Sequence, residues 1–355
     1  MRSRSPQYPP KRPLHDDARR VVLTVRQGIL RAASLGLAVV IVASCGGAAA
    51  PGEAAPAEPR ATAAARAATF TPEPTATPAP APTATPGASV TGVPMTGMDS
   101  EATPTPGPAA NYDELPVAAE DPAGLVRQFA TIDAALHDAN ISAAKLAYLG
   151  HLQQLALGRL ADYPEWKDAV LAGLAGTARA AVAGSFEAGK QLRSMSGFVP
   201  TRLPDWKIVA PASITELMGF YKEAEQTFGV PWQYLAAIHL VETRMGRIRG
   251  LSSAGAQGPM QFMPATWAMY GRGDINDTHD AILGAARYLV AAGAPGNMPR
   301  ALFAYNHANA YVNALIAYAD VMKADPASYK GYWGWQVYYP TKDGPFLMPV
   351  GWTNQ

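Results

Sequence analysis

A short apolar segment that carries a single acid, residues 230–267, constrains the fold of this chain more than any other feature. Pro231 suits a first helical position, because its missing N–H would have no partner there in any case. The residues that then recur at three- and four-residue steps, as on one side of a helix, are Leu235, Ile238, His239, Glu242 and Met245. The spacing therefore predicts a helix whose core-facing side includes the carboxyl group of Glu242.

A carboxyl group on such a side has two interpretations, because Glu is seldom buried without a partner. Partial burial would disfavour the ionised form of Glu242, raise its pKa and keep a proton donor available near neutral pH. Alternatively, Glu242 pairs with one of the arginines that follow it and merely closes the helix. Those arginines are Arg244, Arg247 and Arg249. The helix by itself does not decide between these interpretations.

The next segment, residues 252–261, reads S-S-A-G-A-Q-G-P-M-Q. Its glycines, Gly255 and Gly258, allow positive φ and a close approach of the backbone to a ligand. Met260 and Gln261 place an adaptable apolar side chain beside an amide that both donates and accepts hydrogen bonds. The alternative is a glycine-rich turn between two helices, with Met260 in the core.

Three motifs in order resemble those of the lytic murein transglycosylases. They are E-T-R-M-G around Glu242, S-x-x-G-A-x-G-x-M-Q from Ser252 to Gln261, and A-Y-N at residues 304–306. The V-E-T-R-x-G form and the F-M-P-A-T-W continuation are most similar to the membrane-bound B-type branch. The resemblance covers residues 204–319, about a third of the chain. It implies a mainly α-helical chain with a lysozyme-like transglycosylase domain.

The resemblance also implies a reaction and a set of roles. The substrate would be the glycan strand of peptidoglycan, cut between N-acetylmuramic acid and N-acetylglucosamine by Glu242 and the substrate's own acetamido group, with a 1,6-anhydro product. Ser252, Gln261 and Asn306 would hold the sugar and its acetamido groups, with Met260 and Tyr305 as apolar walls. Tyr305 could instead be a core residue with a satisfied hydroxyl.

The residues themselves agree with a single-acid reaction. Retaining and inverting glycosidases use two carboxyl groups, and none stands near Glu242 in the sequence before Asp274. Two residues depart from the family pattern: Thr243 replaces a common Ser, and Pro259 replaces a common Leu or Tyr. The alternatives are a muramidase that adds water, a glycan-binding lipoprotein without activity, and a tether whose helical region binds a protein partner.

The N-terminus has the pattern of an export signal. Residues 1–31 are rich in Arg and Lys, an apolar run follows to residue 43, and Cys45, the only cysteine, stands directly after it. The sequence V-A-S-C at residues 42–45 resembles a bacterial lipobox, which implies a lipid anchor on Cys45 and an extracytoplasmic place in the cell envelope. An uncleaved anchor and an ordinary signal are the alternatives. A single cysteine excludes an intrachain disulfide.

The remaining chain divides by composition. We predict a signal peptide at 1–44, a disordered Pro/Ala/Thr-rich linker at 45–120, a helical accessory region at 121–200 and the catalytic domain at 201–355. The last of these ends in an aromatic, β-prone tail that predicts a hairpin after residue 332. The hairpin would cover the core or, alternatively, offer a platform for sugars. The net charge of +1 gives no sign of nucleic-acid binding.

Neither metal pattern in the chain is convincing, and we predict neither a metal nor another cofactor. The acidic segment 271–280 departs from the calcium loop, because His279 stands where the loop needs glycine. Asp277 is expected to cap a helix instead. His239 and Glu242 could hold zinc at i, i+3, but no third ligand is evident.

Overall fold

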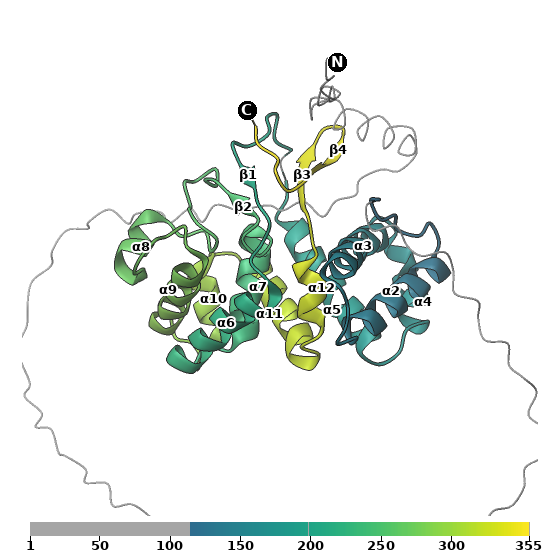
Figure 1. Ribbon diagram of the computed structural model, residues 1–355, viewed down its shortest axis with the longest axis horizontal. Coiled ribbons are helices and arrows are strands. Elements are labelled where there is room, and N and C mark those ends of the chain that lie inside the picture. Colours follow the sequence, from purple (N-terminus) through teal and green to yellow (C-terminus); the bar gives the residue numbers. More distant parts are fainter. Residues whose placement is uncertain (1–113, 198, 355) are drawn as a thin grey trace, which may run out of the picture. The chain divides into compact units, whose positions relative to one another are not determined.

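The computed structural model describes residues 114–197 and 199–354 (Figure 1). The predicted signal peptide, Cys45 and most of the predicted linker lie outside the described residues. Within these ranges the chain is mainly helical, with two small antiparallel sheets. No helix there combines the length and the apolar composition that a membrane crossing requires.

The predicted accessory region contains four α-helices and one short 3-10 helix. They are α2 (Pro122–Leu136), α3 (Ala143–Asp162), η1 (Pro164–Trp166), α4 (Lys167–Ala172) and α5 (Gly176–Ser194). The carboxylate of Asp121 accepts from the N–H of Gly124 at 2.8 Å, and the hydroxyl of Ser142 accepts from that of Lys145 at 3.2 Å. Side-chain acceptors of this kind satisfy the unpaired N–H groups of a first turn. The sequence predicts a cap at Asp121, directly before Pro122, and a second helix after Ser142, and both starts are confirmed.

The rest of the chain contains seven helices and four strands among the described residues. They are β1 (Lys207–Ile208), α6 (Ile214–Phe228), α7 (Trp232–Thr243), β2 (Ile248–Arg249), α8 (Pro264–Tyr270), α9 (Thr278–Ala291), α10 (Met298–Tyr305), α11 (Asn309–Ala324), α12 (Ser328–Trp333), β3 (Val337–Thr341) and β4 (Gly344–Met348). The S-x-x-E pattern at residues 213–216 predicts a cap for α6, and Asp277 is the predicted cap of α9. Both are confirmed, since Ser213 accepts from the N–H of Glu216 and Asp277 from that of Asp280.

Helix α7 is the centre of this packing. It contacts α6, α9, α11 and α12, and Figure 1 shows it between α6 and α11. Every residue of α7 except Tyr234 is buried. The predicted core-facing residues, Glu242 among them, are buried as expected. The restriction of burial to one side is wrong, because neighbours cover the helix on all sides. Pro231 caps α7 instead of opening it, and Met245 lies beyond its end.

A break separates α10 from α11. The sequence predicts one helix over residues 301–319, with Tyr305 and Asn306 near its start, and this prediction is wrong. Tyr305 ends α10, and Asn306 is extended, with φ −145° and ψ 121°. Ala308 is also extended before α11 begins. The break turns the chain between the two helices at Asn306, beside Tyr305.

The two sheets share a small apolar cluster. β1 pairs with β2, and β3 pairs with β4 from Val337 opposite Met348 to Thr341 opposite Gly344. The buried residues of the cluster are Trp206, Ile208, Ile248, Val337 and Met348. The predicted hairpin is confirmed as a cover for this cluster. The β-prone tail begins later than expected, because Tyr332 and Trp333 belong to α12.

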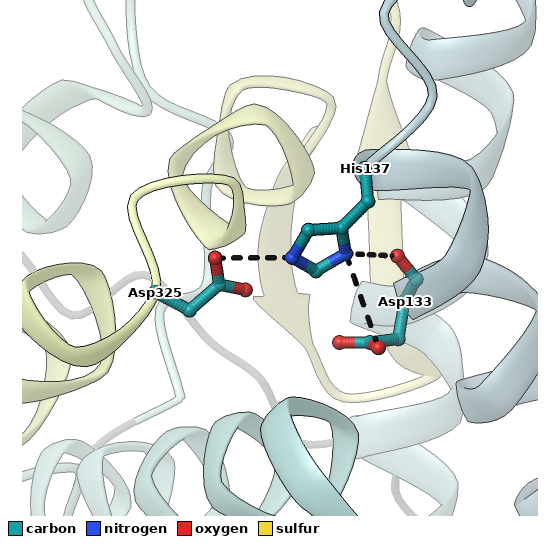
Figure 2. A group of neighbouring side chains, drawn as sticks. All are labelled: Asp133, His137 and Asp325. Carbon is teal, nitrogen blue, oxygen red and sulfur yellow. Dashed lines mark hydrogen bonds and ion pairs between the residues drawn. The ribbon is translucent and has the colours of Figure 1, made fainter. Parts of the chain in front are cut away.

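The accessory helices meet the later part of the chain along α5 and α11, and again at His137 near the end of α2. Figure 2 shows the imidazole between two acids. Its Nδ1 lies 2.8 Å from the carbonyl oxygen of Asp133 and 4.0 Å from that residue's carboxylate, while Nε2 lies 3.2 Å from Asp325 Oδ1. Both ring nitrogens face acceptors, so the doubly protonated ring fits best. The backbone hydrogen bond to Asp133 and the charges of Asp325 and Asp133 raise the pKa of His137.

This contact predicts a pH-dependent contribution to stability. Because folding raises the pKa of His137 above 6.5, the contribution is complete below pH 6.5 and is lost as pH rises through the folded pKa. We expect His137→Gln to be less stable than the wild type in urea unfolding at pH 5.5 and equal to it at pH 8.5. An equal difference at both pH values would contradict the assignment.

Candidate active site

Glu242 lies one residue before the end of α7 and is only 8% exposed. Burial raises the pKa of its carboxyl group from 4.5 to about 7, because the ionised form loses hydration. The hydroxyl of Tyr311, on α11, donates to Glu242 Oε1 at 2.6 Å and opposes part of that rise. No second carboxyl group is among the causes of the shift. Near neutral pH the acid is thus divided between its two protonation states.

The interpretation that Glu242 pairs with an arginine is wrong. Arg244 donates to the carbonyl of Leu240 within its own helix end. Arg247 donates to the carbonyl of Trp333, and Arg249 to that of Asn276. None of the ion pairs among the described residues includes Glu242. Each of the three guanidinium groups donates to a backbone carbonyl, and none of them pairs with the carboxyl group of Glu242.

The loop after α7 is held by its own polar groups. The hydroxyl of Ser252, predicted to contact sugar, accepts from the N–H groups of Ala254 at 3.3 Å and Ala256 at 2.9 Å. Gly255 and Gly258 have φ of +84° and +73°, as predicted. A Cβ added to Gly258 would lie 1.9 Å from the carbonyl oxygen of Ile275. Glycine is required there by conformation and by space.

Met260 and Gln261 stand differently in the loop. The Met260 side chain is fully buried in the core, and its carbonyl oxygen accepts from the hydroxyl of Tyr305 at 2.6 Å. Gln261 has φ +50°, and its Nε2 donates to the carbonyl of Gly258 at 3.0 Å. Its Oε1 is buried without a hydrogen-bond partner among the described residues. A buried acceptor without a partner is unfavourable, so this oxygen is suited to receive a donor from a ligand.

Three hydroxyl groups draw these elements together around the acid. Thr243 reaches the carbonyl of Pro259, Tyr305 reaches that of Met260, and Tyr311 reaches Glu242. Burial and the charge of Glu242 raise the pKa of both tyrosines, so Tyr305 is also close to the acid. Asn306 follows Tyr305 at the helix break and is buried. Of the predicted site residues, Glu242, Met260 and Tyr305 therefore take part in these contacts, together with Thr243 and Tyr311, which were not predicted. The Ser252 hydroxyl instead bonds within its own loop.

The sequence places Tyr311 only as a later residue of the helix predicted over 301–319 and does not identify it as a partner of the acid. The available signal was general: a buried tyrosine hydroxyl usually finds a hydrogen-bond partner. Nothing local to Tyr311 indicates that the partner is an acid 69 residues earlier in the chain.

The groups of described residues that could hold a metal ion do not include Glu242. Among the described residues, the groups of three or more that could hold an ion are Asp133, His137 and Asp325, and Asp277, His279 and Asp280. In the second group, Asp277 caps α9 and Asp280 accepts from the N–H of Asp274. His239 faces the hydroxyl of Tyr221 at 2.7 Å through Nδ1. Burial lowers the pKa of His239 to about 3, so its ring is neutral.

Comparison with known proteins connects this arrangement to a family. Residues 219–325 match the family described as Transglycosylase SLT domain. This range includes Glu242, the loop and Tyr311. The predicted mainly helical, lysozyme-like transglycosylase domain is confirmed by this match and by the helices observed.

One curated relative is Membrane-bound lytic murein transglycosylase F from Thiobacillus denitrificans, 28% identical over 127 residues. The aligned region is 34% of this chain and 27% of that protein, so the chain spans about a quarter of its relative's length. The similarity to the B-type branch stays a prediction. No solved structure is significantly similar to the chain.

The raised pKa of Glu242 predicts a loss of stability with rising pH. Unfolding returns the carboxyl group to a pKa of 4.5, whereas the folded value is about 7. Between these values the folded protein holds a proton that the unfolded chain releases, so stability falls over this range by about 3 kcal/mol.

Glu242→Gln removes this titration while an amide oxygen remains for Tyr311. We expect its melting temperature to exceed that of the wild type by several degrees at pH 8 and to differ far less at pH 4.5, by calorimetry. An advantage of the same size at both pH values would indicate a packing effect instead of a buried charge.

Tyr311→Phe removes the hydrogen bond from Tyr311 that stabilises the ionised form of Glu242. We therefore expect the pKa of Glu242 to rise further in this variant, measured by NMR titration of ¹³C-labelled carboxyl groups, with Glu242→Gln identifying the signal. Tyr318→Phe, on the same helix and also buried, is the matched control and should leave this titration in place. A midpoint that falls in Tyr311→Phe would contradict the contact.

Proposed function

We propose that this chain, a lytic transglycosylase by the SLT domain at residues 219–325, cleaves the β-1,4 bond between N-acetylmuramic acid and N-acetylglucosamine in peptidoglycan. Glu242 would be the single acid and base, and the product would end in a 1,6-anhydro ring. The observation that supports this most is the carboxyl group itself. It is buried, has no cation beside it and has a pKa of about 7, as a group that both gives and takes a proton near neutral pH requires.

The first step uses the protonated form of Glu242. Its proton passes to the glycosidic oxygen, the bond from that oxygen to C1 of the muramoyl sugar breaks, and the N-acetylglucosamine hydroxyl leaves. The oxygen of the substrate's own 2-acetamido group bonds to C1 and spreads the positive charge. A second protein carboxylate is unnecessary, in agreement with the absence of one among the groups that affect Glu242.

The second step uses the carboxylate that remains. It accepts the proton of the muramoyl C6 hydroxyl, whose oxygen attacks C1 and displaces the acetamido oxygen. The ring closes, Glu242 is protonated again, and no water is consumed. Burial of the site favours this outcome, because water that reached C1 would compete with the C6 hydroxyl.

The neighbouring residues have roles that follow from their contacts. Tyr311 donates to Oε1 and so fixes the rotation of the carboxyl group. The unpaired Oε1 of Gln261 would accept from a substrate N–H or hydroxyl group. Asn306 and Ser252 would contact the sugar, as the family resemblance implies. The side chain of Met260 is fully buried, so its main role would be structural: its carbonyl oxygen accepts the hydrogen bond that anchors Tyr305.

We also propose that the chain works in the cell envelope, outside the cytoplasm, held to the membrane by a lipid on Cys45. The position of this cysteine directly after an apolar run supports the anchor, and the relative from Thiobacillus denitrificans is itself named as membrane-bound. The predicted linker would then give the catalytic domain a reach of tens of ångströms or more toward the glycan strands.

Digestion of purified peptidoglycan tests the reaction. We expect Glu242→Gln to lower turnover by about 10² or more while binding to insoluble peptidoglycan is kept. Glu165→Gln, which changes an exposed acid, should remain as active as the wild type. Wild-type activity should fall as pH rises through about 7, because the proton donor is lost.

Mass spectrometry of the digest separates the outcomes. Anhydro ends lack one water relative to hydrolysed ends and support the proposed reaction. Hydrolysed ends would identify a muramidase instead. Binding without cleavage by the wild type would identify a glycan-binding protein and overturn the proposal.

A further inference from the structure

We propose that Thr243 is a positioning residue, whose buried hydroxyl joins the turn after the catalytic helix to the loop peptide at Pro259 and so keeps the site around Glu242 closed. The inference rests on the proposed function, because it assigns Glu242 as the acid. It concerns the residue directly after that acid in the chain.

The hydroxyl of Thr243 makes two hydrogen bonds to two different segments. It donates to the carbonyl oxygen of Pro259 at 2.5 Å and accepts from the N–H of Gly246 at 3.0 Å. The side chain is fully buried. Water therefore cannot easily replace either bond, and each backbone group would be left without a partner if the hydroxyl were removed.

The turn on one side of Thr243 is strained. Arg244, Met245 and Gly246 have φ of 54°, 60° and 79° in succession. A non-glycine residue in this region is strained and persists only where its surroundings hold it. The N–H groups of Arg244 and Met245 bond to carbonyls of α7, those of Leu240 and His239. The N–H of Gly246 depends on the Thr243 hydroxyl.

The loop on the other side is held by hydroxyl groups from two helices. The carbonyl of Pro259 accepts from Thr243 at the end of α7, and the next carbonyl, that of Met260, accepts from Tyr305 at the end of α10. Both helix ends are close to the acid, since Glu242 precedes Thr243 and its charge acts on Tyr305. Loss of the Thr243 bond would leave this stretch of the loop anchored from α10 alone.

Loss of the Thr243 hydrogen bonds would affect the reaction by admitting water to the site. A loosened loop would hydrate Glu242, lower the pKa that burial has raised, and leave less of the acid protonated at neutral pH. Water near the site would also compete with the C6 hydroxyl. A residue that only supported the fold would alter stability without moving the titration of Glu242.

The test compares two replacements of the same residue. Thr243→Val keeps the shape and removes the hydroxyl, whereas Thr243→Ser keeps the hydroxyl and removes a methyl group. In Thr243→Val we expect the titration midpoint of Glu242 to fall by about one pH unit from about 7. Turnover at pH 7 should fall roughly fivefold with the protonated fraction, and KM should change little. In Thr243→Ser all three should stay near the wild-type values. Glu242→Gln identifies the NMR signal.

These measurements distinguish failure of the proposed role of Thr243 from failure of the proposed cleavage reaction. A wild-type midpoint and wild-type turnover in Thr243→Val would overturn the proposal, as would equal shifts in Val and Ser. If Thr243→Val does not fold, Thr243→Cys, with a weaker and longer donor, replaces it and should give a smaller fall in the same direction. If the wild type does not cleave peptidoglycan, the proposed function fails, while the midpoint still reports whether Thr243 keeps Glu242 buried.

Discussion

The rest of the site depends on one buried carboxyl group, that of Glu242, which accepts a hydrogen bond from the hydroxyl of Tyr311. The surrounding helices must keep this group away from water and from cations. Burial raises the pKa of Glu242 to about 7, so that near neutral pH a large part of the acid still holds its proton. The arginines that stand close in sequence do not pair with it, because each donates to a backbone carbonyl instead. A cation beside the acid would stabilise its ionised form and remove the proton donor. The proposed chemistry therefore depends on this isolation.

Two features of the fold maintain that isolation. Helix α7 is covered by four other helices, so the acid at its end is shielded from water by packing rather than by one lid. The break after α10 then allows α11 to begin in a new direction, with Tyr311 in its first turn facing Glu242. A continuous helix over residues 301–319 would have carried Tyr305 and Tyr311 on one rigid rod. The extended conformation at Asn306 uncouples the two tyrosines, one of which reaches the loop while the other reaches the acid.

The contacts around Thr243 and His137 differ in what they hold. Thr243 is fully buried and joins two strained or glycine-dependent segments next to the acid. His137 is partly exposed and joins α2 to the chain after α11, so its contribution is screened by solvent and varies with pH. The first contact belongs to the site, and the second belongs to the attachment of the accessory helices.

The sequence by itself determined what depends on near neighbours. The helix starts at Asp121, Ser142, Ser213 and Asp277, the glycine conformations at Gly255 and Gly258 and the three ordered motifs are all local, because a cap or a turn is made within four residues. Tertiary structure alone decided that Tyr311 and not an arginine is the partner of Glu242, that α7 is buried on every side, and that the helix breaks at Asn306. These outcomes depend on contacts between segments tens of residues apart. The local sequence does not decide between the possible partners, whereas packing and desolvation in the folded chain do.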